Sequence, residues 1–425
     1  MAFLFMAGAF AAIAAGRYFS GRWLTPFNAY LFAQGFLLGI AFLKLSPEMS
    51  DFHISTWLAV ISSMLAFGIG SLLGRFEKPG HLEPNSTFEK EFETTFLHLA
   101  SRIQPLLLIS FSIGVYLSYQ SAGQWPAFSS SPEDSRILFA WPGFAGVMFF
   151  QVIYILALCS VVLLTKENGF LWRILGVTGI AFPVLVSGLS GMRFYGILVI
   201  ISILFFRDSK RPLKLSHLII SGVAIVSLLV FLFLVRLNLL NATAINFGLQ
   251  HRESLKALYM PIYLYVANNY WNLDWLFLHH DTFRSLESSF GYFSFSGLIY
   301  PTHFTFALDD ALETSMRFVS VLKIPNFNTT SYQGVLFVDF GWPGLLIIPL
   351  VWGYFSTVVH RRATKSECIY YRILYAILGF SIFFSFFVWI FQQPSFVIGL
   401  LFVLAMGAFA KINSTRRLNA SKAKG

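Results

Sequence analysis

Long apolar runs occupy most of this chain, and they leave little room for any fold other than a bundle of membrane-spanning helices. About 20 apolar residues in a helix match the ~30 Å hydrocarbon core of a bilayer. Only 12% of the 425 residues are charged, against about 25% in soluble domains. We therefore predict an all-α polytopic membrane protein with about eleven transmembrane helices. The predicted spans are residues 1–15, 28–43, 55–74, 104–121, 137–165, 171–190, 194–206, 216–235, 335–359, 373–391 and 395–410.

The first and the shortest of these runs need separate treatment. Residues 1–15 have the apolar core and small residues of a signal peptide, but no positive charge precedes that core. Arg17 and Arg22 follow the run instead, which favours a retained first span. The short run 194–206 is expected to extend past its charged flank to reach the length of a span.

Lysine and arginine concentrate in alternate loops, and this sets the orientation of the bundle. Because basic loops stay in the cytoplasm, we predict that this set faces the cytoplasm and that the other loops face outward. The same clustering in short loops argues against nucleic acid as a partner, despite the net charge of +10. The basic set comprises 17–22, 75–102, 166–173, 207–214, 360–372 and the tail from Lys411.

Residues 86–102 lie in one of these cytoplasmic loops and have an amphipathic pattern. Phe88, Phe92 and Phe96 recur at helical spacing against several acidic residues. The pattern fits a helix on the cytoplasmic membrane surface, and it fits equally a helix packed under the bundle.

One long stretch, 236–334, lies on the outer side between two spans. About a hundred residues is far more than a turn between two helices needs. The stretch is rich in tyrosine and tryptophan, which argues against disorder, and its apolar residues from Leu255 to Tyr270 recur at helical spacing. We predict a long outer loop with interfacial helices, attached to a single integral membrane domain that spans residues 1–425.

Two charged residues fall inside the predicted spans, Arg193 and Asp339, and both lie near the outer ends. A transporter normally carries ionisable groups deep within its spans, so this placement moves the predicted working surface to the outer membrane boundary. Arg193 follows a Ser-Gly turn, where it could grip phosphate oxygens or simply reach lipid headgroups. Asp339 is costly in an apolar helix unless paired, and an outer arginine is its expected partner.

Further candidates lie on the outer loop. Arg236 ends one span, and His251, Arg252 and Glu253 begin the predicted interfacial helix, although consecutive residues cannot all share one helical face. The His279-His280-Asp281 triplet lacks the spacing of a metal site, so we predict no metal.

The order of spans, the Ser-Gly-Met-Arg turn, the long late outer loop, and an Asn/Thr-rich approach to Asp339-Phe-Gly-x-x-Gly344 resemble the bacterial O-antigen polymerase (Wzy) group. The paired Arg-x10-Gly motifs of some members are absent after Arg193, Arg236 and Arg252. What carries over is Arg193 after its turn, and Asp339 with the two glycines.

The resemblance implies a multi-pass enzyme of the bacterial inner membrane with a GT-C-like architecture and a periplasmic active face. Such an enzyme moves a glycan from undecaprenyl diphosphate to the sugar end of another lipid-linked repeat unit, without a cofactor or metal. Its other implied partners are membrane lipids and a chain-length regulator. Arginines would then stabilise the departing diphosphate, and a base would activate the acceptor hydroxyl. The candidate arginines are Arg193, Arg252 and Arg236; the candidate bases are His251, Glu253, His303 and Asp339; the candidate sugar-binding residues are Tyr265, Asn328, Thr329 and His303.

Two alternatives stay open. An O-antigen ligase would use the same donor but a lipid A core as the acceptor. A flippase for lipid-linked oligosaccharide belongs to another class, and the near absence of charge within the spans argues against it.

Overall fold

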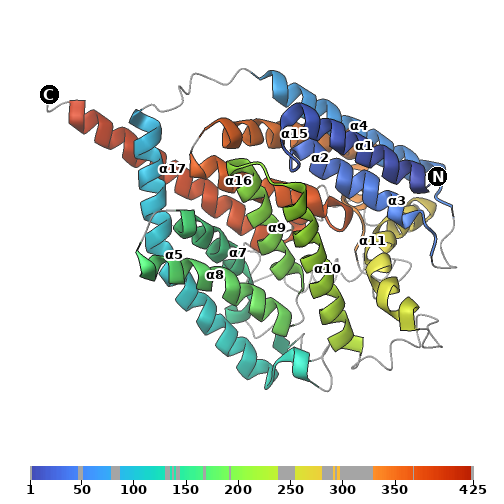
Figure 1. Cartoon of the computed structure of the whole chain (residues 1–425), viewed down its shortest axis with the longest axis horizontal. Helices are drawn as coiled ribbons and strands as arrows, with labels where there is room; N and C mark the ends of the chain where they lie inside the picture. Colours follow the sequence, from blue (N-terminus) through green and yellow to red (C-terminus); the bar gives the residue numbers. More distant parts are fainter. Residues whose placement is uncertain are drawn as a thin grey trace.

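Every regular element in the part of the chain that the structure describes is a helix (Figure 1). The structure is a computed structural model. It describes residues 2–45, 51–77, 87–129, 144–165, 169–190, 193–237, 254–279, 329–366 and 368–422, and the short pieces 135, 138–139, 291 and 294–296.

Seven of the described helices are long and apolar enough to cross a membrane, which confirms the predicted class of an all-α membrane protein. They are α1 (Ala2–Ser20), α4 (Ile54–Phe76), α5 (Thr87–Ala122), α8 (Phe170–Leu189), α15 (Tyr332–Lys365), α16 (Ile369–Phe383) and α17 (Pro394–Lys422). Below, the end of the bundle at which α1 and α4 begin is called the outer end, following the predicted orientation.

The other predicted spans also fall on helices, although the total of eleven stays a prediction. These helices are α7 (Phe144–Thr165), α9 (Arg193–Lys210), α10 (Leu215–Leu237) and a broken helix made of α2 (Pro26–Leu31), η1 (Phe32–Phe36) and α3 (Leu37–Ala41). Helix α9 continues through Arg207 to Lys210, as expected for the short run 194–206.

The amphipathic segment 86–102 is the first half of α5, a continuous helix of 36 residues. Its apolar face is turned into the bundle: the rings of Phe92 and Phe96 lie 5.6 and 5.5 Å from that of Tyr370 on α16, edge to face. Of the two arrangements that the sequence allowed, the structure has the packed helix.

Helices α4 and α15 approach each other closely because glycines remove side chains from their interface. A Cβ atom placed on Gly70 would lie 1.9 Å from the carbonyl oxygen of Leu350, and one on Gly353 would lie 2.3 Å from that of Phe67. Gly70 and Gly74 are four residues apart on one face of α4, the spacing that lets membrane helices touch backbone to backbone. This contact lies in the C-terminal half of α4, away from the outer end.

Helix α15 is not the single span that residues 335–359 predict. Gly341 has φ +58°, a left-handed conformation that glycine adopts without strain, and it breaks the helix. The rings of Tyr332 and Trp352 are 5.7 Å apart, whereas 20 residues of straight helix would separate them by about 30 Å. The first arm of α15, residues 332–340, therefore folds back along the second arm, 342–365.

Helix α11 (Ser254–Leu278) is the helix that the spacing from Leu255 to Tyr270 predicts. It lies crosswise to α1 and α4 at the outer end, beside α3 (Figure 1). The Tyr263 hydroxyl donates to the carbonyl oxygen of Ala41 over 3.0 Å, and the Tyr270 hydroxyl donates to that of Ala33 over 2.7 Å. Burial raises the pKa of Tyr263, so its hydroxyl keeps the proton that makes this bond.

Candidate functional site

Three interrupted helices meet at one buried polar cluster, which we call the Gln333 network. Its members are Gln34 in η1, Ser63 in α4, Gln333 in the first turn of α15, and Ser385 in η5 (Phe384–Phe386), and all four side chains are fully buried. The Gln333 amide donates to Gln34 Oε1 at 2.9 Å and to Ser63 Oγ at 3.2 Å. The Gln34 amide donates to Ser385 Oγ at 2.8 Å.

The position of this network matters because polar groups and broken helices are both unusual inside a membrane bundle. Ser63 lies near the middle of α4, so the network is far from either end of that helix. Residues 32–36 form a π-helix, a wider helical turn with i→i+5 hydrogen bonds that is frequent at functional sites. Irregular backbone is tolerated at such depth only where protein or a cavity satisfies it. Here the hydrogen bonds among the four side chains satisfy uncharged polar groups at that depth.

Aromatic side chains surround the network and supply further polar groups. Tyr30 and Tyr332 share a hydrogen bond between their hydroxyls at 2.6 Å. The indole rings of Trp352 and Trp389 lie 5.7 and 5.9 Å from the Tyr332 ring. Within the described part of the chain, both indole N–H groups and Gln333 Oε1 are buried without a hydrogen-bond partner. Two donors and one acceptor are thus available to a water or a polar ligand group.

The Gln333 network was not predicted from the sequence, because only charged residues within the spans were considered as functional and neutral amides were not. Gln34 and Gln333 stand within or beside apolar runs, where a buried amide needs a partner to offset its desolvation. That signal was present in the sequence, but nothing in the spacing of the two glutamines shows that they meet.

Replacing Gln333 by leucine should lower the free energy of unfolding by about 2 kcal/mol, because Gln34 Oε1 would be buried without its donor. The check is the thermal unfolding midpoint of the purified protein in detergent. Gln120→Leu is the control, since Gln120 is exposed near the end of α5. Equal midpoints for Gln333→Leu and the wild type would show that the amide bonds contribute nothing.

Above the network, α11 meets the segment that leads into α15. Thr329, a predicted sugar-binding residue, donates its hydroxyl to Asn269 Oδ1 at 2.6 Å, and its carbonyl oxygen accepts from the Asn272 amide at 2.7 Å. The N–H of Ser331 donates to the carbonyl oxygen of Asn269 at 3.3 Å. These bonds join the outer loop to the start of the first arm of α15. Thr329 therefore belongs to a hydrogen-bonded group with Asn269, Asn272 and Ser331, which we call the polar layer.

Tyr265 lies on the same helix, one turn before Asn269. Its ring stacks on that of Phe387 with centroids 5.8 Å apart, and 36% of the residue is exposed. One face of the Tyr265 ring is therefore covered by Phe387, and its role in binding a sugar stays a prediction.

Asp274 anchors α11 to the outer end of α4. Its carboxylate accepts from the N–H of His53 at 2.7 Å and from the Thr56 hydroxyl at 2.6 Å. His53 is the N-cap of α4, where a negative charge is favoured by the helix dipole. Asp274 is fully explained by this structural role.

Asp339 is buried near the end of the first arm of α15, two residues before the break at Gly341. Its carboxylate accepts a hydrogen bond from the backbone N–H of Ser294, a residue of the outer loop. Because Asp339 and Gln333 are six residues apart on this arm, about 9 Å along its axis separates them. The expected arginine partner stays a prediction, since the side chains of Arg193 and Arg236 lie outside the described residues.

The remaining predicted site residues divide by how much of them the structure describes. Arg193 is the first residue of α9, and Arg236 is the penultimate residue of α10, so both lie at helix ends as expected. His251, Arg252, Glu253, His303 and Asn328 lie outside the described residues. The structure therefore binds Thr329 to Asn269 and Asn272 on α11, the helix that also carries Tyr265. It places Asp339 on the first arm of α15, and the arginine cluster stays a prediction.

His279, at the end of α11, packs on Trp275 with ring centroids 3.6 Å apart. Its Nδ1 lies 3.0 Å from the carbonyl oxygen of the same residue. No group of three or more potential metal ligands is found within the described ranges.

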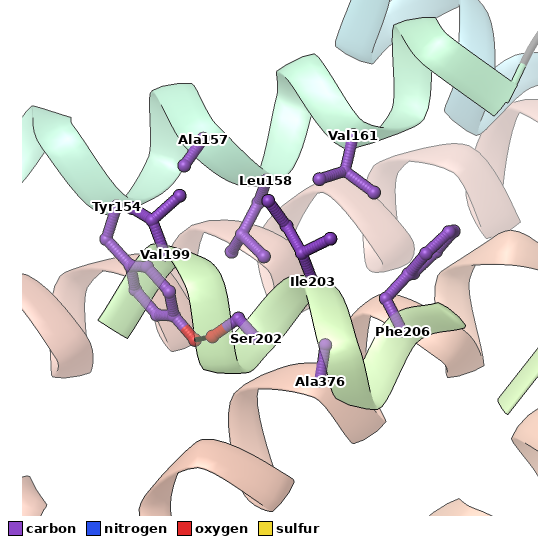
Figure 2. A pocket seen from close by; sticks show the side chains of 9 residues that line it. All are labelled: Tyr154, Ala157, Leu158, Val161, Val199, Ser202, Ile203, Phe206 and Ala376. Atoms are coloured by element: carbon purple, nitrogen blue, oxygen red, sulfur yellow. Dashed lines mark hydrogen bonds between the residues drawn. The ribbon is translucent and has the colours of Figure 1, made fainter. Parts of the chain in front are cut away.

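A small cavity lies deep between α7, α9 and α16 (Figure 2). Its volume is about 10 Å³, which is room for about one water. Figure 2 shows apolar side chains around it, with the Tyr154 hydroxyl and Ser202 Oγ hydrogen-bonded at 3.2 Å on one side. This cavity is too small for a substrate, so the polar layer at the outer end is the better candidate site.

Searches against protein families, curated proteins and solved structures find no significant match to this chain.

Proposed function

We propose that this protein polymerises lipid-linked oligosaccharide repeat units at the outer face of the bacterial inner membrane. It would transfer the growing glycan from undecaprenyl diphosphate to the sugar end of another lipid-linked unit. The observation that carries the proposal is the polar layer at the outer end, where α11 crosses the bundle and joins Thr329 and the first arm of α15.

The proposed chemistry assigns a role to each candidate residue. The donor leaves as a lipid diphosphate, and its growing negative charge needs cations, which Arg193, Arg252 and Arg236 supply in this proposal. The acceptor hydroxyl needs a base. Asp339 is the candidate base that the structure describes, and the other candidates are His251, Glu253 and His303. Asn269, Asn272 and Thr329 offer uncharged donors and acceptors of the kind that bind sugar hydroxyls.

A flippase is the second candidate, and the Gln333 network favours it. Transporters place substrate sites at mid-membrane between broken helices, and three interrupted helices meet at this network. The described residues of the network include no ionisable group other than the surrounding tyrosines, so coupling to a proton gradient has no carrier among them. An O-antigen ligase shares the donor chemistry and differs in its acceptor.

A deletion strain separates the three functions. Loss of a polymerase leaves single repeat units on the cell surface, loss of a ligase leaves polymer on the carrier lipid, and loss of a flippase leaves repeat units inside the cell. We expect the first pattern, read from the glycan ladder and restored by the wild-type chain. Either of the other two patterns would contradict the proposal.

Purified protein should extend lipid-linked repeat units in the presence of a chelator, because arginines rather than a metal stabilise the leaving group in this proposal. The measurement is polymer length with and without the chelator. Inhibition that added metal reverses would count against the arginine mechanism.

A further inference from the structure

A hollow of about 740 Å³ lies at the outer end, between the start of α1, the end of α3 and the start of α4. One wall is made of nearly parallel rings: Trp57 lies 5.4 Å from Phe5 and 4.8 Å from Phe42, with interplanar angles of 22° and 24°. Leu43 adds to this apolar lining, and Lys44 and Asp51 form the polar rim. An apolar hollow with one cation at its rim suits a molecule with a hydrocarbon chain and an anionic head.

The cation at the rim is available to such a head group. Lys44 forms an ion pair with Asp51, and the two side chains are 37% and 87% exposed. An exposed pair of this kind contributes little to stability, so a phosphate can take the place of the Asp51 carboxylate at low cost. Among the described residues, Lys44 alone has a positive φ without being glycine, at +49°. Such strained conformations gather at ligand sites.

The hollow also adjoins the candidate site. The N–H of Leu45 donates to the Tyr263 hydroxyl at 3.1 Å, and that hydroxyl donates to the carbonyl oxygen of Ala41. Lys44 is therefore held next to α11, the helix that carries Asn269 and Asn272. Six residues of α11, a rise of about 9 Å, separate Tyr263 from Asn269. A head group at Lys44 would therefore lie on the same helix as the polar layer.

Helix α1 lines the hollow with Phe3 and Phe5 and also has an exposed apolar surface. Helix α1 is a candidate span, and Phe3, Leu4 and Phe10 on it are 76%, 78% and 57% exposed. Apolar side chains this exposed on a membrane span face lipid tails. A chain can enter sideways along α1 without crossing a polar barrier.

We propose that this hollow holds the hydrocarbon chain of a polyprenyl phosphate-type lipid, with the phosphate at Lys44. The hollow of about 740 Å³ has room for a stretch of hydrocarbon chain, and its single rim lysine matches one anionic head group. The choice of a polyprenyl carrier rests on the proposed function, since that carrier is the lipid on which a repeat unit is built.

Retention of undecaprenyl phosphate by the purified protein tests the inference, counted by native mass spectrometry without any turnover. Lys44→Glu should weaken retention at least tenfold, because it places an anion against the phosphate, whereas Lys44→Arg should retain the lipid as the wild type does. Leu43→Trp should weaken it by filling the hollow with no change of charge. Lys411→Glu is the matched control, an exposed lysine on α17 far along the chain, and should retain the lipid normally.

Each outcome separates the lipid site from the proposed function. Unchanged retention in both Lys44→Glu and Leu43→Trp, in proteins that elute like the wild type, would overturn the lipid site. Displacement of undecaprenyl phosphate by an equal concentration of phosphatidylglycerol would also overturn it, since the hollow would then be an ordinary bilayer contact. If the protein binds the lipid through Lys44 but does not polymerise repeat units, the lipid site is supported and the proposed polymerase function is contradicted.

Discussion

Replacing Gly353 by leucine should leave almost no correctly folded protein. The Cβ atom alone would lie 2.3 Å from the carbonyl oxygen of Phe67 and 3.1 Å from the N–H nitrogen of Ser71, both backbone atoms of α4 that no side-chain rotation can move. The helices would have to separate, and with them the contact that supports Tyr30, Ser63 and the first arm of α15. We expect a loss of more than about 4 kcal/mol, which exceeds what most single substitutions cost.

Size-exclusion chromatography of a fluorescent fusion in detergent measures this effect as the loss of the single symmetric peak. The matched control is Gly222→Leu on α10, where an added Cβ meets nothing within 4 Å. Leucine is favoured over glycine in a helix by up to about 1 kcal/mol, so the control should fold as well as the wild type. A native elution profile for Gly353→Leu would mean that α4 and α15 do not touch as described.

The sequence predicts the helices well because membrane spans are defined by local composition. A run of apolar residues of sufficient length has one stable solution in a bilayer, whatever its neighbours are. Helix α11 was also predictable, because apolar residues from Leu255 to Tyr270 recur at helical spacing.

What the sequence does not predict depends on contacts between distant residues. Gln34 and Gln333 are 299 positions apart, and nothing local to either shows that they share a hydrogen bond. The fold-back of α15 had a local signal in Gly341-Trp-Pro-Gly, but apolar residues on both sides concealed it and favoured one continuous span. The glycines of α4 are likewise uninformative until the partner helix is known.

The candidate site follows the same division. Thr329 and Asp339 were predicted from their type and their place beside an outer loop, and both lie in the region where α11 and α15 meet. Their partners Asn269 and Ser294 were not predicted, because the sequence does not show which amide or backbone group lies opposite each of them.

Replacing Asp339 by asparagine should reduce chain extension by about 10²–10⁴-fold while leaving the fold intact, if this carboxylate is the general base of the proposed reaction. Asparagine keeps the size of the side chain, and its Oδ1 can still accept the hydrogen bond from Ser294. The substitution therefore removes the negative charge and the basic oxygen without removing the structural contact. The measurement is the rate of polymer growth from lipid-linked repeat units by purified protein.

Asp274→Asn is the control that distinguishes a base from a structural carboxylate. Asp274 is also buried at the outer end, but its oxygen is committed to His53 and Thr56 at the start of α4. Its variant should keep chain extension within a few fold of wild type, with at most a lower unfolding temperature. If Asp339→Asn extends chains as fast as Asp274→Asn does, Asp339 only ties the outer loop to α15. The base must then be sought among His251, Glu253 and His303.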